Sequence, residues 1–153
     1  MTQTMLIGGD SPAAKYVADQ LSESQRLLHK SAAGGMGRVI REELAEVWDE
    51  CRVPDWDGYS AFPVSWDAYH NAKRFLLALP LGVPIPSVGA EPAGNVTLEW
   101  HHSRRRTLSI SVSPNNELCY AALLGPGRVC GTEFFFGEVP KTILELIERV
   151  YSC

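Results

Sequence analysis

The sequence predicts an α+β fold, in which an antiparallel β-meander of about four to five strands packs against helices and carries an N-terminal helical extension. Three observations predict it. Helical periodicity dominates residues 38–79, strand-like alternation dominates residues 96–124, and an amphipathic stripe closes the 153-residue chain. We expect the extension to comprise residues 1–53 and the α+β domain to comprise residues 54–153. A chain of this length supports a single core, so one compact unit is expected.

The first half of the chain predicts helices. One begins near Ser11 and Pro12, because serine caps helix N-termini and proline suits the first helical position. Small residues at 31–37 then predict a flexible linker. A second helix is expected from about Arg38, since apolar residues recur along one face. These residues are Ile40, Leu44, Val47, Trp48 and Cys51.

A third helix is predicted over residues 65–79. Ser65 is the expected N-cap, and Val64 and Tyr69 can pack together as a hydrophobic staple at the helix entrance. Prolines at 80, 84 and 86 end it, because proline lacks the N–H donor of a helix. The expected buried stripe consists of Trp66, Tyr69, Ala72, Phe75, Leu76 and Leu79.

The second half of the chain predicts the meander. The expected strands are residues 85–90, 96–100, 107–113, 118–124 and 129–136, separated by turns rich in Pro, Gly and Asn. Short links of this kind join antiparallel neighbours. A last helix is expected from Pro140 and should pack on the sheet through Ile143, Leu146, Ile147, Val150 and Tyr151.

Alternation along two of the strands assigns the faces of the sheet. Leu98 and Ile110 represent the core side, because side chains two residues apart share a face. The other side is a polar stripe of Thr97, Glu99, His101, Thr107, Ser109, Ser111 and Ser113. Residues 118–124 are apolar on both faces. We therefore expect that strand to be covered on both sides, or to meet a partner on one.

Composition and charge limit the function classes. The net charge is −4 and the pI is about 5.5, which opposes broad attraction to nucleic acid or anionic membranes. No apolar run is long enough to span a bilayer and no leader is recognised, so a cytoplasmic location without membrane contact is expected. Cys51, Cys119, Cys130 and Cys153 lack metal-site spacing. The first three are expected to be reduced and buried as small apolar side chains. No metal and no cofactor is predicted.

An aromatic motif precedes the third helix, with the sequence Trp-Asp-Gly-Tyr-Ser-Ala-Phe-Pro at residues 56–63. Together with Leu79-Pro80, Glu99-Trp100 and Tyr120, it resembles a signature of an uncharacterised family of small bacterial proteins encoded in mobile or defence-linked gene neighbourhoods. The resemblance covers residues 55–153. It implies that this part of the chain folds as one unit, and it implies no catalytic activity.

The motif has two physical interpretations. Asp57-Gly58 is a turn pair, and Trp56 and Tyr59 can bury their rings while each keeps one polar atom hydrogen-bonded. On that interpretation the rings hold the following helix against the sheet. Alternatively, exposed rings form a recognition patch, because aromatic residues are enriched at interface hot spots.

Histidine and serine side chains on the polar stripe suggest an enzyme alternative. His101 and His102 are consecutive in a strand, so they should point to opposite faces and not chelate one ion. His101 with Glu99 and either Ser109 or Ser111 could supply a base, an orienting carboxylate and a hydroxyl on one face. This hypothesis describes a small hydrolase or transferase.

Arg104, Arg105 and Arg106 form the basic cluster of the chain, at a predicted hairpin tip. Guanidinium groups there could bind nucleic acid, bind an acidic protein surface, or keep a turn solvated. No complete catalytic constellation is present. The sequence therefore favours a non-catalytic protein-binding module, such as an inhibitor, an antitoxin-like partner or an adaptor in a bacterial or phage conflict system. A second copy of the chain is another partner to consider. Its candidate binding residues are Trp56, Tyr59, Glu99, His101, Arg104, Arg105, Arg106, Ser109 and Ser111.

Overall fold

The computed structural model describes residues 34–152, and these residues fall into two units. The larger unit contains Val39–Ala78 and residues 86–152, and the smaller one contains Gly34–Arg38 and Leu79–Ile85. The helix expected near Ser11 lies outside the described residues, as does Cys153. The boundary expected at residue 53 stays a prediction, although residues on both sides of it belong to the larger unit.

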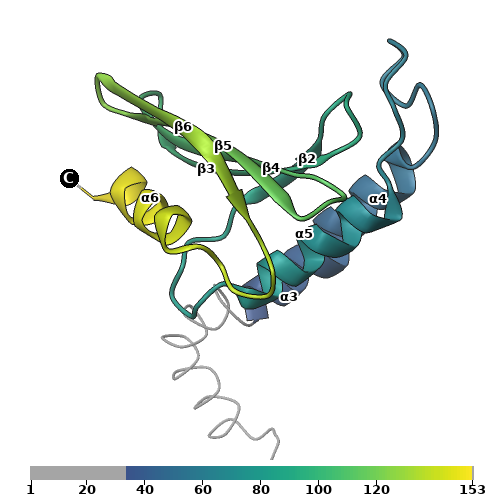
Figure 1. Ribbon diagram of the computed structural model, residues 1–153. Coiled ribbons are helices and arrows are strands. Elements are labelled where there is room, and N and C mark those ends of the chain that lie inside the picture. The colour runs from purple at the N-terminus through teal and green to yellow at the C-terminus, as the bar shows by residue number, and fades with distance from the viewer. Residues whose placement is uncertain (1–33, 153) are drawn as a thin grey trace, which may run out of the picture. The chain divides into compact units, whose positions relative to one another are not determined.

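The larger unit is built on a five-stranded antiparallel meander (Figure 1). The strands follow one another in space in their order along the chain. Their bounds are β2 Ser87–Ala90, β3 Val96–Ser103, β4 Arg106–Val112, β5 Glu117–Leu124 and β6 Gly127–Phe134. Alternation and turn chemistry located each strand to within about two residues, except that β3 continues three residues beyond its expected end. The predicted α+β fold with a meander is confirmed.

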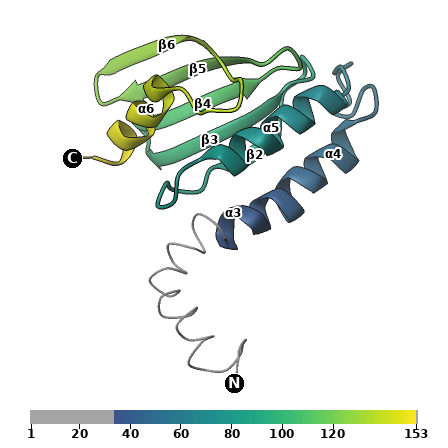
Figure 2. The same ribbon diagram turned by 60° about the horizontal axis from the view of Figure 1, so that its bottom comes forward.

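One face of the sheet carries the core. Val96, Leu98 and Trp100 of β3 are fully buried, and Leu108, Ile110 and Val112 of β4 lie opposite them in register. Helix α6 (Lys141–Tyr151) packs across β3, β4 and β5, and helix α5 (Trp66–Ala78) packs against β3 and β4 (Figure 2). The buried face of α6 consists of Ile143, Leu146, Ile147 and Val150. Four of the five residues predicted for that face are therefore buried.

The helical segment before the sheet differs from the sequence prediction at its start. It comprises α3 (Gly34–Arg38), the π-helix η2 (Val39–Leu44) and α4 (Ala45–Cys51). The expected linker at 31–37 is wrong for residues 34–37, which are helical despite their three glycines. Extending an existing helix costs much less free energy than nucleating one, so the stronger sequence downstream can carry these residues.

The π-helix also protects an edge of the sheet. Strand β2 is an edge strand, and both η2 and α4 pack against it. The Val88 N–H donates to the Glu43 carboxylate of η2 at 3.3 Å. Because this N–H is already hydrogen-bonded, it is not available to pair with a strand of another chain. Occupying edge donors in this way limits unwanted strand pairing.

Helix α5 begins as its sequence predicts, and four of the six residues predicted for its buried stripe are buried, namely Ala72, Phe75, Leu76 and Leu79. The Ser65 Oγ accepts a hydrogen bond from the Ala68 N–H at 3.1 Å, which confirms the N-cap. Trp66 was expected to be buried and is 57% exposed. Asn71 is buried instead, because its amide donates to the Ser113 carbonyl at 3.0 Å and to the Pro114 carbonyl at 3.3 Å. A polar side chain can be buried when its hydrogen bonds are satisfied. The spacing of apolar residues alone therefore does not place Asn71 in the core.

Candidate functional site

The face of the sheet opposite the helices holds four of the nine predicted site residues, namely Glu99, His101, Ser109 and Ser111. Glu99 is paired with Ser109 and His101 with Thr107, while Ser111 is paired with Thr97. All of these side chains lie on that second face, because their positions alternate along the strands with the buried positions. We call this second face the open face. Glu99 and His101 are exposed, and the hydroxyl residues are half-buried. The predicted polar stripe is confirmed.

The open face does not assemble these residues into a catalytic arrangement. The Ser111 Oγ accepts a hydrogen bond from the Asn95 amide at 3.2 Å, and that amide also donates to Glu91 at 3.3 Å. Within residues 34–152, no hydrogen bond joins His101 to Glu99, Ser109 or Ser111. The enzyme alternative therefore gains no hydrogen-bonded base and nucleophile from this geometry.

The two adjacent histidines point to opposite sides, as expected. The β3–β4 register shifts between His101 and Ser103, and the His102 ring lies 5.2 Å from the Tyr151 ring of α6. Burial raises the pKa of the Tyr151 hydroxyl. His101 faces the open side. In the described part of the chain, no group of three or more His, Cys, Asp or Glu residues is placed to hold a metal ion.

Among the residues that the structure describes, strand β5 is covered on one face only. Leu118 and Ala122 are buried beneath the helices, whereas Cys119 and Ala121 are exposed on the open face. The expectation that Cys119 and Cys130 are buried is therefore wrong. Both thiols are exposed, because their positions alternate with the core positions and no described element covers that side. Cys51 is buried, as expected.

The arginine cluster also differs from the prediction. Arg106 does not join Arg104 and Arg105: its guanidinium donates to the Arg149 carbonyl at 2.8 Å, near the C-terminal end of α6. A cation there interacts favourably with the helix dipole. Arg128, which is 22 residues further along the chain than Arg106, lines the same hollow as Arg104 and Arg105. We call Arg104, Arg105 and Arg128 the arginine corner.

The loop formed by the aromatic motif is tied together by its own polar groups. The Trp56 indole donates to the Phe62 carbonyl at 2.8 Å, and the Asp57 carboxylate accepts from the Tyr59 N–H at 2.8 Å. The expectation that both rings hold α5 against the sheet is wrong for Tyr59, which is 87% exposed. Short-range hydrogen bonds fix the loop and leave this ring in solvent.

A cluster of aromatic rings in mutual contact, which the sequence did not predict, joins α4 to α5. The Trp66 ring lies 5.5 Å from Trp48 and 5.3 Å from Tyr69, and His70 stacks on Trp66 at 6.0 Å. We call Trp48, Trp66, Tyr69 and His70 the aromatic cluster. The Arg52 guanidinium lies 5.8 Å from the Trp48 ring centre. The sequence signal for this cluster is the helical spacing of its aromatic residues. That spacing predicted that their rings are buried in the core.

Comparisons of the chain with protein-family models, with curated proteins and with solved structures found no match. No helix among the described residues combines the length and the apolar character that crossing a membrane requires.

Proposed function

We propose that this protein is a non-catalytic protein-binding module and that the aromatic cluster is the centre of its binding surface. The observation that carries the proposal is the exposure of large rings in one short region. Within the cluster, Trp66 is 57% exposed and His70 is exposed, and between residues 53 and 66 the other large apolar side chains that are exposed are Val53, Tyr59 and Phe62. Tryptophan, tyrosine and arginine are the residue types most enriched at interface hot spots.

The rings of the cluster are held in place before any partner arrives. Trp48 contacts both Trp66 and Tyr69, with ring centres 5.5 and 5.1 Å apart, so each ring restricts the others. Ordering mobile side chains is a cost of association, and rings that are already ordered reduce that cost. Each aromatic ring can bury about 150–250 Å². The cluster therefore supplies both apolar area and rigidity.

The biological setting is proposed on the resemblance alone. The proposed roles are those of an inhibitor, an antitoxin-like partner or an adaptor in a bacterial or phage conflict system, acting in the cytoplasm. The lack of a hydrogen-bonded catalytic group on the open face, within the described residues, is compatible with a binding role.

Affinity purification from the native host tests the proposal. The wild-type chain, tagged at either end, should capture a reproducible protein partner, and W66A should lose it while keeping the wild-type melting temperature. F136A is the matched control, because Phe136 is exposed in a different part of the chain. Absence of a partner in both tag orientations, or retention of the partner by a folded W66A variant, would refute the proposal.

A further inference from the structure

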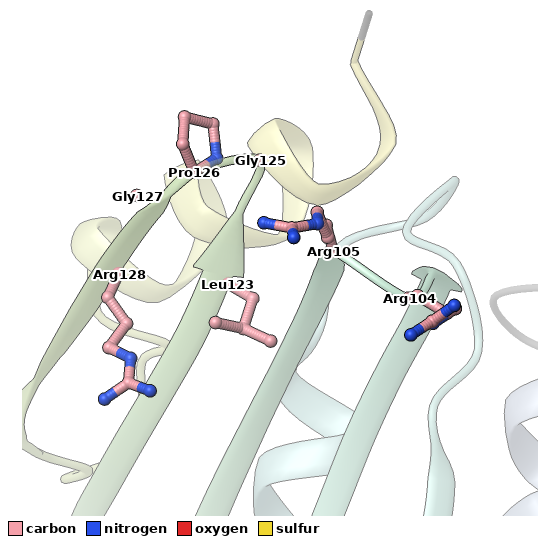
Figure 3. Close-up of a pocket in the computed structure, with 7 residues that line it drawn as sticks. All are labelled: Arg104, Arg105, Leu123, Gly125, Pro126, Gly127 and Arg128. Atoms are coloured by element: carbon pink, nitrogen blue, oxygen red, sulfur yellow. The ribbon is translucent and has the colours of Figure 1, made fainter.

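The arginine corner borders a hollow at one end of the sheet. The turns that join β3 to β4 and β5 to β6 meet there, because the Gly125 N–H donates to the Arg105 carbonyl at 2.8 Å. The hollow has a volume of about 330 Å³ and is lined by the three arginines, Leu123 and the turn residues 125–127. Figure 3 shows Leu123 between Arg128 on one side and Arg104 and Arg105 on the other.

The positive charge of this hollow is not neutralised from within the described chain. No carboxylate of residues 34–152 forms an ion pair with Arg104, Arg105 or Arg128, and their guanidinium groups donate none of the hydrogen bonds found there. Each guanidinium offers five N–H donors. Each of these guanidinium groups would attract an anion that entered the hollow.

The neighbouring side chains add polar donors without adding acid. His101, Thr107, Leu123 and Arg128 form one row across four strands, since each is paired with the next in register. Leu123 gives this row an apolar floor, while His101 and Thr107 extend it with an imidazole and a hydroxyl. The nearest acidic residue on this face of β3 is Glu99, which lies in the adjacent row.

We infer that the arginine corner binds the phosphate group of a small phosphomonoester. Guanidinium groups pair with phosphate through two parallel hydrogen bonds, and a phosphate dianion matches three positive charges better than a single carboxylate does. The volume of the hollow is near the lower end of the range for small-molecule sites, about 300–1,000 Å³. Leu123 provides the apolar surface against which the organic part of the ligand packs. None of the aromatic cluster takes part, so this inference is independent of the proposed protein binding.

Titration calorimetry of the whole chain at low ionic strength tests the inference, with inorganic phosphate and AMP as probes. Wild-type protein should bind both, and R128Q and the double variant R104Q/R105Q should each weaken binding by tenfold or more. R41Q is the control, because it removes one exposed arginine on η2 and should leave affinity unchanged. Amide signals of residues 123–125, 127 and 128 should shift in an NMR titration of the wild type and remain unshifted in R128Q.

Four results would overturn the inference. They are no binding of phosphate or AMP at millimolar concentration, equal weakening by R41Q and R128Q, equal affinity for citrate and phosphate, and an R128Q-sensitive affinity for a dT12 oligonucleotide at least tenfold above that for AMP. The third would make the site one for carboxylates, and the fourth would make it part of a nucleic-acid surface. Because Arg104, Arg105 and Arg128 are exposed, the variants should fold, and their melting temperatures verify this.

Discussion

Gly94, in the turn between β2 and β3, lies against the loop before α5. Its φ is +94°, and a Cβ atom built on it would lie 2.9 Å from the Pro63 carbonyl oxygen. The contact is reinforced nearby, since the Phe62 N–H donates to the Pro92 carbonyl at 2.8 Å. Glycine is therefore needed at this position both for its backbone conformation and for the space it leaves.

We expect G94A to lower the free energy of unfolding by about 2–4 kcal/mol, because it combines left-handed backbone strain with a backbone clash. G58A is the matched control: Gly58 has a φ of +78° but no atom within 4 Å of its added Cβ. It should cost about 1–2 kcal/mol. Denaturant unfolding of the two variants measures the difference, and equal losses would show that the clash is relieved by movement of the loop.

The cysteines predict a reactivity order. Burial, and to a smaller extent the neighbouring Glu50 carboxylate, raises the pKa of the Cys51 thiol, whereas Cys119 and Cys130 are exposed. Thiolate is the reactive form, so Cys51 is protected both by access and by protonation. In a C153S background at pH 8, we expect two fast-reacting thiols in the native protein and a third that reacts only on unfolding. Rapid modification of Cys51 in the folded state, detected by mass spectrometry, would contradict this.

The N-cap of α5 is the element-scale feature that the sequence predicted most directly. Ser65 accepts the Ala68 N–H, and the helix begins at Trp66. We expect S65A to lower the free energy of unfolding by about 1 kcal/mol, since an uncapped N–H is left unsatisfied. S65D should preserve stability, because its carboxylate caps the helix and interacts favourably with the dipole. Thermal melts of the three proteins test this, and equal destabilisation by both substitutions would exclude a capping role.

Local patterns predicted the elements better than they predicted the faces of the helices. The strands followed from alternation and turns, because register in a meander is set by short links. Trp66 was misassigned because apolar spacing cannot reveal that Asn71 bonds to the β4–β5 turn through Ser113 and Pro114. The exposure of Tyr59 depends on hydrogen bonds within one loop, which composition does not reveal.

The sequence predicted two members of the arginine corner, Arg104 and Arg105, and missed the third, Arg128. The reason also lies in the strands. Arg104 and Arg105 were identified as neighbours, but Arg106 directly precedes Thr107, which was already assigned to the open face. The sequence prediction grouped Arg106 with Arg104 and Arg105, but alternation puts Arg106 on the helix side, where it binds the Arg149 carbonyl. Arg128 required the β5–β6 register, in which it is paired with Leu123. That pairing depends on the turn of residues 125–127 and not on any local charge pattern.

The larger unit is asymmetric: in the part of the chain that the structure describes, one face of its sheet is covered by helices and the other is open. α6 packs on the three central strands, while β2 and β6 are the edges. On the β2 edge, the Val88 N–H donates a hydrogen bond to the Glu43 carboxylate. β3, β4 and β5 are each paired with a strand on both sides and packed by α6 on one face. They should therefore be the most stable part of the protein, because opening them requires loss of the shared core.

Hydrogen exchange followed by mass spectrometry tests this order of stability. We expect peptides from β4 to exchange most slowly, peptides from β3 and β5 to follow, and those from β6 and the loop of residues 52–65 to exchange fastest. Within residues 34–152, β6 is paired with β5 alone, so its amides can open without disrupting the core. Protection of β6 equal to that of β4 would contradict the order. Repeating the experiment at tenfold lower protein concentration then identifies the cause, since protection that falls on dilution means that a second copy pairs with the β6 edge.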